Sequence, residues 1–328
     1  MGSRGKRQES ESRAREAPSS SGEVRTTPRL DPVLPDAIFA SPRGSPKEAP
    51  RKRSEDARPA AARSFPGLPT IGSVVDKYRL EELLGIGGFA AVYRATHLIL
   101  KTTVALKLLR PDVLRRRPHL VSRLCEEAMY AARIAHPNVV KVIDVTSAGP
   151  LTYVVLEFID GVTLEKLVRT RGKLSVKTTI DVALDVVAGL RAGAAQGLIH
   201  RDVKPANILV TREGKAKIVD LGLAHSGPDS SDRGEATASR PMFVGTRGYI
   251  APEQKERPEH VDFRADVYSL GITLYQCLTG TLPDDPIDPS RIPSPLSSII
   301  ARMTAHDRDA RHASYDALES DLRALLQG

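Results

Sequence analysis

Tryptophan is absent from this sequence, and aromatic residues of all kinds make up only 4% of its 328 residues. Cysteine is almost as scarce, since only Cys125 and Cys277 occur, in segments that read as two separate helices. This usage excludes a disulfide-stabilised scaffold. We expect two buried thiols in a reducing compartment, the cytoplasm.

Long hydrophobic runs are also missing. No stretch of roughly 18 uncharged apolar residues occurs, so the sequence predicts no membrane span. The first residues, MGSRGKR, have no apolar stretch behind them, and we therefore expect no secretory signal. Hydrophobic residues still make up 41% of the chain, which is enough to form the core of one large domain or of two domains of ordinary size.

The net charge of +8 is concentrated near the N-terminus. Residues 1–70 hold 14 Lys and Arg against 9 Asp and Glu, with 10 of the 24 prolines and only two aromatic residues. Such a segment cannot bury enough apolar surface to offset the entropy lost on ordering. We therefore predict that residues 1–72 form a disordered basic tail rich in Pro, Ser and Arg. Contact with nucleic acid or an anionic surface is the less favoured role, because a charge run of mixed sign is usually solvated.

The most informative stretch is residues 200–210, which read HRDVKPANILV. It places an acid, a cation and an amide close together, at Asp202, Lys204 and Asn207. A carboxylate can accept the proton of an attacking hydroxyl, an ammonium group can steady phosphoryl charge, and an amide oxygen can hold a metal ion. The apolar end of the stretch predicts a buried strand that fixes the loop. A charged surface turn is the alternative interpretation.

This stretch resembles the catalytic loop of eukaryotic-type (Hanks-type) serine/threonine protein kinases, including bacterial members, with the pattern H-R-D-x-x-x-x-N and a Lys-Pro pair. The resemblance implies an α+β, bilobal protein-kinase-like fold, with a small antiparallel β-sheet N-lobe and a mainly helical C-lobe. It also implies that Asp202 is the catalytic base, that Lys204 stabilises charge, and that Asn207 helps to hold Mg²⁺ or Mn²⁺.

Residues 84–93 read LGIGGFAAVY and predict a hairpin with glycines at its tip. Glycines let backbone amides approach phosphates closely, and an aromatic ring at the tip can exclude water from them. The stretch resembles the kinase glycine-rich loop G-x-G-x-x-G-x-V, with Ala90 in place of the third glycine. An ordinary glycine-turn hairpin is the alternative. The resemblance implies that ATP is contacted by Leu84, Gly85, Ile86, Gly87, Gly88, Phe89, Ala90, Ala91 and Val92.

The next segment, Val104–Lys107, predicts a strand, and Lys107 resembles the lysine that contacts the α- and β-phosphates of ATP. Apolar residues at helical spacing over residues 122–135 then predict a helix. Glu126 and Glu127 on this helix are both candidates for the counter-charge of Lys107, and the resemblance favours Glu127.

Two further strands are expected, at residues 138–144 and 151–158, to complete the small sheet. The second ends in LEFIDG, which resembles the gatekeeper and hinge of protein kinases. The resemblance implies that the backbone of Glu157 and Ile159 meets the adenine ring, and that Ala105 completes the set of ATP contacts.

Residues 217–222 read KIVDLG, and Asp220 resembles the metal-binding aspartate of the D-F-G motif, with Leu221 replacing Phe. Asn207 and Asp220 are therefore expected to hold two divalent ions. The polar stretch that follows contains Thr237 and Ser239, which resemble activating phosphorylation sites. Phosphate there could pair with Arg201 and order the segment.

Residues 245–253 read GTRGYIAPE and resemble the end of a kinase activation segment. We expect Glu253 to pair with Arg311, and Asp266 to brace the catalytic loop. Between Gly280 and Leu296 lie five prolines, so we expect that a helix usual in similar kinases is missing there.

The resemblance predicts a protein kinase domain over residues 76–326, with the N-lobe at about 76–157 and the C-lobe at about 162–326. Its expected activity is transfer of the γ-phosphoryl group of ATP to serine or threonine of protein substrates. Two alternatives stay open. One is a pseudokinase or scaffold that binds nucleotide or a partner without turnover, and the other is a small-molecule phosphotransferase.

Overall fold

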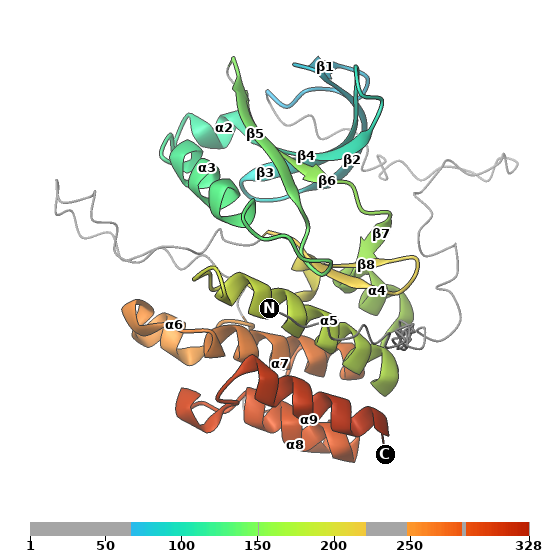
Figure 1. The fold of residues 1–328 in the computed structure, drawn as a ribbon, viewed down its shortest axis with the longest axis vertical. Coiled ribbons are helices and arrows are strands. Elements are labelled where there is room, and N and C mark those ends of the chain that lie inside the picture. The colour runs from blue at the N-terminus through green and yellow to red at the C-terminus, as the bar shows by residue number, and fades with distance from the viewer. Residues whose placement is uncertain (1–66, 150, 221–247, 284–286, 328) are drawn as a thin grey trace, which may run out of the picture.

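In the computed structural model, which describes residues 67–149, 151–220, 248–283 and 287–327, a six-stranded sheet occupies one end of the molecule and most helices occupy the other (Figure 1). This arrangement confirms the expected bilobal α+β architecture. The predicted tail falls mostly on residues 1–66, which lie outside the described ranges.

The N-lobe sheet is antiparallel, with the strand order β1-β2-β3-β4-β6-β5. Burial alternates along the first part of β2, whereas the central strands β4 and β6 are buried along most of their length. In β2, for example, Tyr78 and Leu80 are buried while Arg79 and Glu81 are not. The bounds are β1 (Val74–Val75), β2 (Tyr78–Ile86), β3 (Ala90–His97), β4 (Thr103–Leu109), β5 (Val142–Ala148) and β6 (Leu151–Glu157).

Each face of this sheet has a small apolar core of its own. One core gathers Leu80, Leu106 and Tyr153 with their neighbours. The other lies under helix α3 (Leu120–Ala131), where Leu124 and Ala128 pack against the sheet. A short helix, α2 (Pro111–Leu114), connects β4 to α3.

Two element boundaries differ from the sequence prediction by four residues each. Helix α3 ends at Ala131 rather than at residue 135, and β5 begins at Val142 rather than at residue 138. The intervening chain is used to contact the C-lobe instead. The amide of Val140 donates to the carbonyl of Ile218 at 2.9 Å, and the amide of Ile218 donates to the carbonyl of Asn138 at 2.8 Å.

Residues 67–72, which we expected to belong to the tail, pack against the N-lobe. Leu68 contacts the apolar core of the sheet, and the hydroxyl of Tyr93 donates to the carbonyl of Pro69 at 3.0 Å. The amide of Gly72 donates to the carbonyl of Leu80 at 2.8 Å. The N-lobe therefore includes residues that composition alone assigned to the tail.

The C-lobe is built mainly from helices around one large apolar core. Its long helix α5 begins after Ser175, whose hydroxyl accepts a hydrogen bond from the amide of Thr178. A small sheet, β7 (Gly161–Thr163), β8 (Ile208–Thr211) and β9 (Ala216–Ile218), lies where the lobes meet. The α-helices are α4 (Leu164–Arg171), α5 (Val176–Ala194), α6 (Pro252–Glu256), α7 (Arg264–Thr279), α8 (Ser294–Met303) and α9 (Tyr315–Gln327).

The proline-rich connection between α7 and α8 agrees with the expected loss of a helix. In its described residues, 281–283 and 287–293, the helical structure is a single 3-10 turn, Pro289–Arg291. The two cysteines lie on separate helices and are free thiols, although only Cys277 is buried, whereas Cys125 is partly exposed. Among the described residues, no helix combines the length and the apolar character needed to cross a membrane.

Candidate active site

Side chains from other elements hold the loop between α5 and β8 through hydrogen bonds to its backbone. The carboxylate of Asp266, on α7, accepts hydrogen bonds from the amides of His200 at 2.9 Å and Arg201 at 2.7 Å. The side chain of Gln254 donates to the carbonyl of Arg201 at 3.0 Å. These contacts hold Arg201 at φ 61°, a left-handed conformation that is costly for a residue with a side chain. The expectation that Asp266 braces the loop is confirmed.

Asp202, Lys204 and Asn207 lie together on this loop. Lys204 Nζ contacts Asp202 Oδ2 at 2.6 Å, and Asn207 Nδ2 donates to the same oxygen at 2.9 Å. Asn207 Nδ2 also donates to the backbone carbonyl of Asp202 at 2.9 Å. The 3-10 turn Pro205–Asn207 brings the amide back toward the carboxylate. The arrangement fixes one carboxylate next to one cation and one amide.

Lys107 and Asp220 meet across the lobes. Lys107 Nζ donates to Asp220 Oδ1 at 2.6 Å, and only 10% of the lysine side chain is exposed. Burial opposes the charged form of Asp220, but the charge and hydrogen bond of Lys107, with smaller contributions from His200 and Lys204, lower the pKa of that carboxyl. Asp220 has φ 59°, so it shares the left-handed backbone of Arg201. Of the four described non-glycine residues with a positive φ, these two belong to the candidate site.

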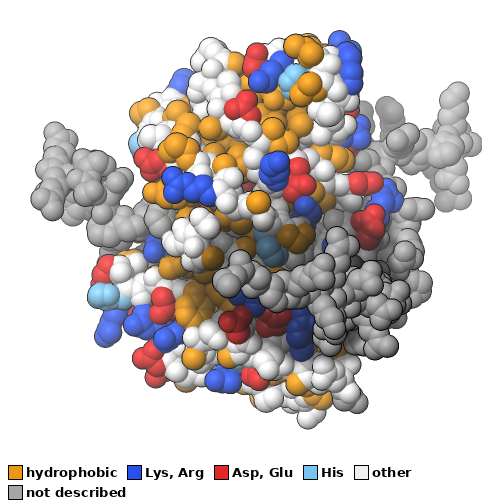
Figure 2. Space-filling view, in the orientation of Figure 1, with side chains coloured by type: hydrophobic (Ala, Val, Ile, Leu, Met, Phe, Trp, Pro, Cys, Tyr) orange, Lys and Arg blue, Asp and Glu red, His pale blue; other side chains and the backbone are white. Residues whose placement is uncertain are grey.

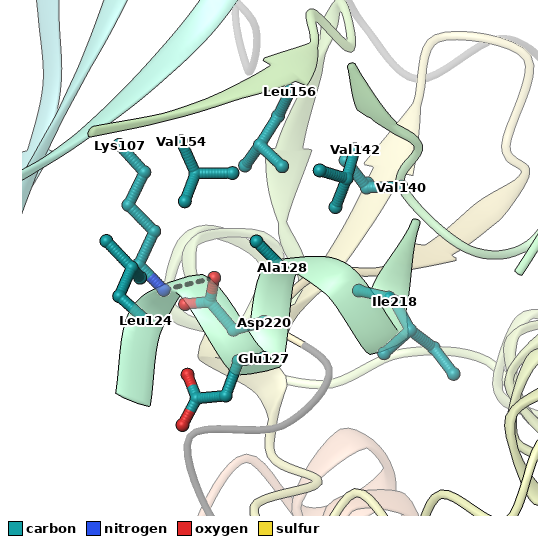
Figure 3. Close-up of a pocket in the computed structure, with 11 residues that line it drawn as sticks. Lys107, Leu124, Glu127, Ala128, Val140, Val142, Val154, Leu156, Ile218 and Asp220 are labelled. Carbon is teal, nitrogen blue, oxygen red and sulfur yellow. Dashed lines mark hydrogen bonds and ion pairs between the residues drawn. The ribbon is translucent and has the colours of Figure 1, made fainter. Parts of the chain in front are cut away.

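The expected partner of Lys107 was Glu127, and the geometry differs from that expectation. Figure 3 draws the contact of Lys107 to Asp220 and not to Glu127. Glu127 is nevertheless buried, with 8% of its surface exposed, and it lines the same cavity as Lys107. Asp220 takes its place because the chain after β9 brings that carboxylate within reach of the lysine.

The cavity between α3 and the sheet has a volume of about 50 Å³. Its walls are apolar, and its charged groups are Lys107, Glu127 and Asp220. The apolar lining comes from Leu124, Ala128, Ala131, Val140, Val142, Val154, Leu156 and Ile218.

The glycine-rich hairpin has the expected form. Gly85 pairs with Val92 and Ile86 with Ala91, and the tip closes where the amide of Gly87 donates to the carbonyl of Ala90 at 2.8 Å. Val92 in turn lies opposite Lys107 on β4, which also carries Ala105. The residues expected to contact ATP thus occupy neighbouring strands.

Ala90 and the hinge differ in detail from what the family pattern implies. The methyl group of Ala90 packs in the core under α3, so a side chain fits where the family pattern has glycine. At the hinge, the amide of Glu157 donates to the carbonyl of Lys141 at 3.0 Å. A contact of Glu157 with adenine would therefore use the carbonyl oxygen of Glu157. The Glu157 carboxylate accepts from Lys217 at 2.8 Å. Ile159 is half-buried beyond it.

The activation segment is described only from Gly248 onward. Leu221, Thr237 and Ser239 lie outside the described residues. At the end of the segment, the guanidinium of Arg311 forms two hydrogen bonds to the carboxylate of Glu253, at 2.7 and 2.9 Å. The predicted pairing of these residues is confirmed.

Two residues of the site were missed by sequence reasoning. Gln254 stands next to the A-P-E glutamate, and Arg110 stands three residues after Lys107. Arg110 contacts the carbonyl of Gly87 at the hairpin tip. The only sequence feature that could have indicated either residue is its position next to a recognised motif.

Residues 78–327 match the family model described as protein kinase domain. The chain belongs to the protein kinase family. The match covers both lobes and confirms the kinase resemblance that the order of the motifs indicated.

Similar proteins point to the serine/threonine branch. Serine/threonine-protein kinase PknB of Mycobacterium tuberculosis is 37% identical over 284 residues, which cover 80% of this chain and 45% of that protein. A probable serine/threonine-protein kinase of Clostridium perfringens is 32% identical over 275 residues, covering 78% of this chain and 39% of that protein. The chain therefore spans less than half the length of these curated relatives.

The fold has solved counterparts. The crystal structure of the Mycobacterium tuberculosis PknI kinase domain matches with a TM-score of 0.61 at 24% sequence identity, and the match covers 78% of this chain and 99% of that one. At this identity the likeness supports the kinase fold alone.

Proposed function

We propose that this protein is an ATP-dependent serine/threonine protein kinase, which transfers the γ-phosphoryl group of ATP to hydroxyl groups of protein substrates. The observation that carries the proposal is the convergence of Lys204 and Asn207 on a single oxygen of Asp202. A carboxylate held in this way is suited to accept the proton of an attacking hydroxyl. The adjacent ammonium group of Lys204 can stabilise the charge that develops during transfer.

The residues present also fit a divalent ion. Asp220 offers a carboxylate whose pKa is lowered, so it is ionised at neutral pH. The amide nitrogen of Asn207 donates both of its hydrogen bonds to Asp202. The amide oxygen is therefore the atom of Asn207 that could bind a metal ion. Oxygen ligands of this type, few in number and completed by phosphate oxygens and water, are what Mg²⁺ prefers. When bound, the ion neutralises phosphate charge.

Turnover requires Lys107 to change partner. In the described form it neutralises Asp220, yet the proposed roles place Lys107 at the phosphates and Asp220 at the metal ion. We infer that Glu127, which is buried and lines the same cavity, becomes the partner of Lys107 in the active form. In this proposal, the ion pair between Lys107 and Asp220 belongs to a conformation that the enzyme leaves before catalysis.

The substrate class and the location belong to the same proposal. The Lys204-Pro205 pair and the intact Glu253–Arg311 anchor of the activation segment favour a protein substrate over a small molecule. Both cysteines are free, which supports action in a reducing compartment such as the cytoplasm.

The test is incubation of the purified chain with labelled ATP, Mg²⁺ and a generic basic protein. We expect label on serine and threonine that survives acid, and labelling slower by about 10²-fold or more when Asp202→Asn replaces the wild type. Nucleotide binding without any labelled protein would instead indicate a pseudokinase. Label that remains only on a small molecule would indicate a small-molecule phosphotransferase.

A further inference from the structure

Arg110 connects the tip of the glycine-rich hairpin to the segment that leads into α3. Its backbone amide donates to the carbonyl of Phe89 at 2.9 Å, which extends the β3–β4 ladder by one bond. Its Nη1 donates to the carbonyl of Gly87 at 3.2 Å. Arg110 therefore binds two carbonyl groups of the hairpin tip, those of Gly87 and Phe89.

The guanidinium of Arg110 is itself held in place. The carboxylate of Asp112 accepts two hydrogen bonds from it, one from Nε at 3.2 Å and one from Nη2 at 2.8 Å. Only 17% of the Arg110 side chain is exposed. A planar, two-point pair of this kind fixes the direction of the remaining nitrogen, Nη1. The contact to Gly87 is thus directional.

Holding a carbonyl also sets the direction of the next amide. In a trans peptide the C=O and the following N–H point in opposite directions within one plane. When Arg110 binds the carbonyl oxygens of Gly87 and Phe89, the amides of Gly88 and Ala90 point away from Arg110. These are amides of the stretch through which a glycine-rich loop contacts phosphate.

A second arginine contacts the aromatic residue at the tip. The guanidinium carbon of Arg117 lies 5.8 Å from the centre of the Phe89 ring, within the range of a cation–π interaction. Phe89 is therefore bound at its carbonyl by Arg110 and at its ring by Arg117. The β4–α3 segment therefore contacts the hairpin tip at both its backbone and its aromatic ring.

We propose that Arg110 is a positioning residue for nucleotide phosphates, which orients the amides of Gly88 and Ala90 by holding the carbonyls that precede them. The inference rests on the proposed function, because it assumes that ATP binds under this hairpin. Arg110 does not touch the nucleotide in this scheme. Its effect should therefore fall on ligands that carry phosphates and spare those that do not.

The experiment compares Mg-ADP with adenosine by calorimetric titration of the full chain and its variants. For Arg110→Ala we expect affinity for Mg-ADP to fall about five- to ten-fold, the size of one or two lost hydrogen bonds, with adenosine affinity unchanged. Arg110→Lys keeps the charge but lacks the planar fork, so it should bind Mg-ADP as weakly as Arg110→Ala. In turnover assays, KM for ATP should rise more than kcat falls.

The matched control is Arg115→Ala, which removes the same charge from an exposed position in the same segment. It should bind Mg-ADP within two-fold of the wild type. An equal loss in Arg115→Ala would show a general charge effect and overturn the inference, as would unchanged Mg-ADP affinity in Arg110→Ala or a parallel loss of adenosine affinity. Failure of the wild type to bind either ligand would instead overturn the proposed function.

Discussion

The two lobes are stabilised in different ways. The C-lobe has one continuous apolar core that joins its helices to the small sheet, whereas the N-lobe has two small cores on opposite faces of one sheet. The surfaces differ too, and Figure 2 shows hydrophobic side chains gathered toward the N-lobe end. Among the described residues, large exposed hydrophobics in the N-lobe are Ile71, Val74, Leu83, Leu84, Ile86, Ile99, Leu100, Met129, Tyr130 and Ile143, against Leu282 and Leu326 in the C-lobe.

The most deeply buried ion pair among the described residues lies in the C-lobe, although that lobe also has exposed pairs such as Arg191 with Asp316. In the C-lobe, Arg311 has a fully buried side chain that meets Glu253 at 2.7 Å. In the N-lobe, Lys77 and Asp144 are 3.5 Å apart with about 40% of each side chain exposed. We infer that the C-lobe holds the catalytic base in one geometry. The N-lobe, which has smaller cores, can adjust its conformation around nucleotide.

The largest effect should come from the buried pair. Arg311→Ala leaves the Glu253 carboxylate buried without its partner, and we expect a loss of about 3–5 kcal/mol in the free energy of unfolding. Lys77→Ala in the N-lobe should cost less than about 1 kcal/mol, because its pair is exposed. Urea denaturation of both variants measures the difference. Equal losses would contradict the division between the lobes.

Asp202→Asn should come next, through activity rather than stability. Loss of the base should lower kcat by about 10²-fold or more, while ATP still binds, because a base acts mainly in the transition state. The melting temperature should stay close to that of the wild type, since Asn can keep a bond to Lys204 or Asn207. Turnover within a few-fold of the wild type would show that Asp202 is not the base.

A smaller effect is expected from the activation segment. Arg201 has its backbone fixed by Asp266 and Gln254, and burial lowers the pKa of its guanidinium. A phosphate nearby would supply a counter-charge to this guanidinium and could order the segment. Replacing both Thr237 and Ser239 with Ala should therefore lower activity several-fold. Mass spectrometry after incubation with Mg-ATP should find phosphate on one of them, and a fully active enzyme without it would exclude the idea.

Removal of residues 1–71 should have a modest effect on the N-lobe. A chain that begins at Gly67 should melt as the full chain does, because residues 1–66 supply no motif and little apolar surface. A chain that begins at Gly72 loses Leu68 and the Pro69–Tyr93 hydrogen bond, and should be less stable by about 1 kcal/mol. Tyr93→Phe isolates the hydrogen bond. Identical melting of both truncated chains would show that residues 67–71 add nothing.

The smallest effect concerns pH and the C-lobe. His312 is fully buried and lies 3.1 Å from Asp321, and burial, with Arg302 nearby, lowers its pKa. An unfolded histidine has a pKa of about 6.5. The histidine therefore resists protonation in the folded state, so its stability contribution is complete above about pH 6.5 and declines as pH falls below it. His312→Gln should show a weaker decline between pH 7 and pH 5, and an unchanged slope would rule His312 out.

Local motifs made much of this structure predictable. Asp202, Lys204 and Asn207 lie within six residues of one another, so their spacing in the sequence already implies a common loop. The pair formed by Lys107 with Asp220 was not predictable in the same way, because it joins residues 113 positions apart on two lobes. Which carboxylate meets the lysine depends on how the lobes are placed, and no local pattern records that.

The boundary errors have a similar cause. The sequence at residues 138–141 is apolar enough to read as the start of a strand, but Val139 pairs with Ile218 of the C-lobe instead of with β6. Residues 67–72 look like the tail in composition, and only the positions of Tyr93 and the sheet core show that they are bound. Tertiary contacts decide such cases, while composition and periodicity do not.

The link between Val139 and Ile218 also limits how α3 can move. Ile134 and Val139 are buried against Leu198 of the C-lobe, so the chain just beyond the end of α3 is fixed to the larger lobe. Glu127 lies four residues from that end, about 6 Å along the helix axis, and Leu120 lies eleven residues from it, about 16 Å. If the helix pivots at its anchored end, each ångström of travel at Glu127 moves Leu120 by almost three. A label at the first turn of α3 would report the approach of Glu127 to Lys107 with that amplification.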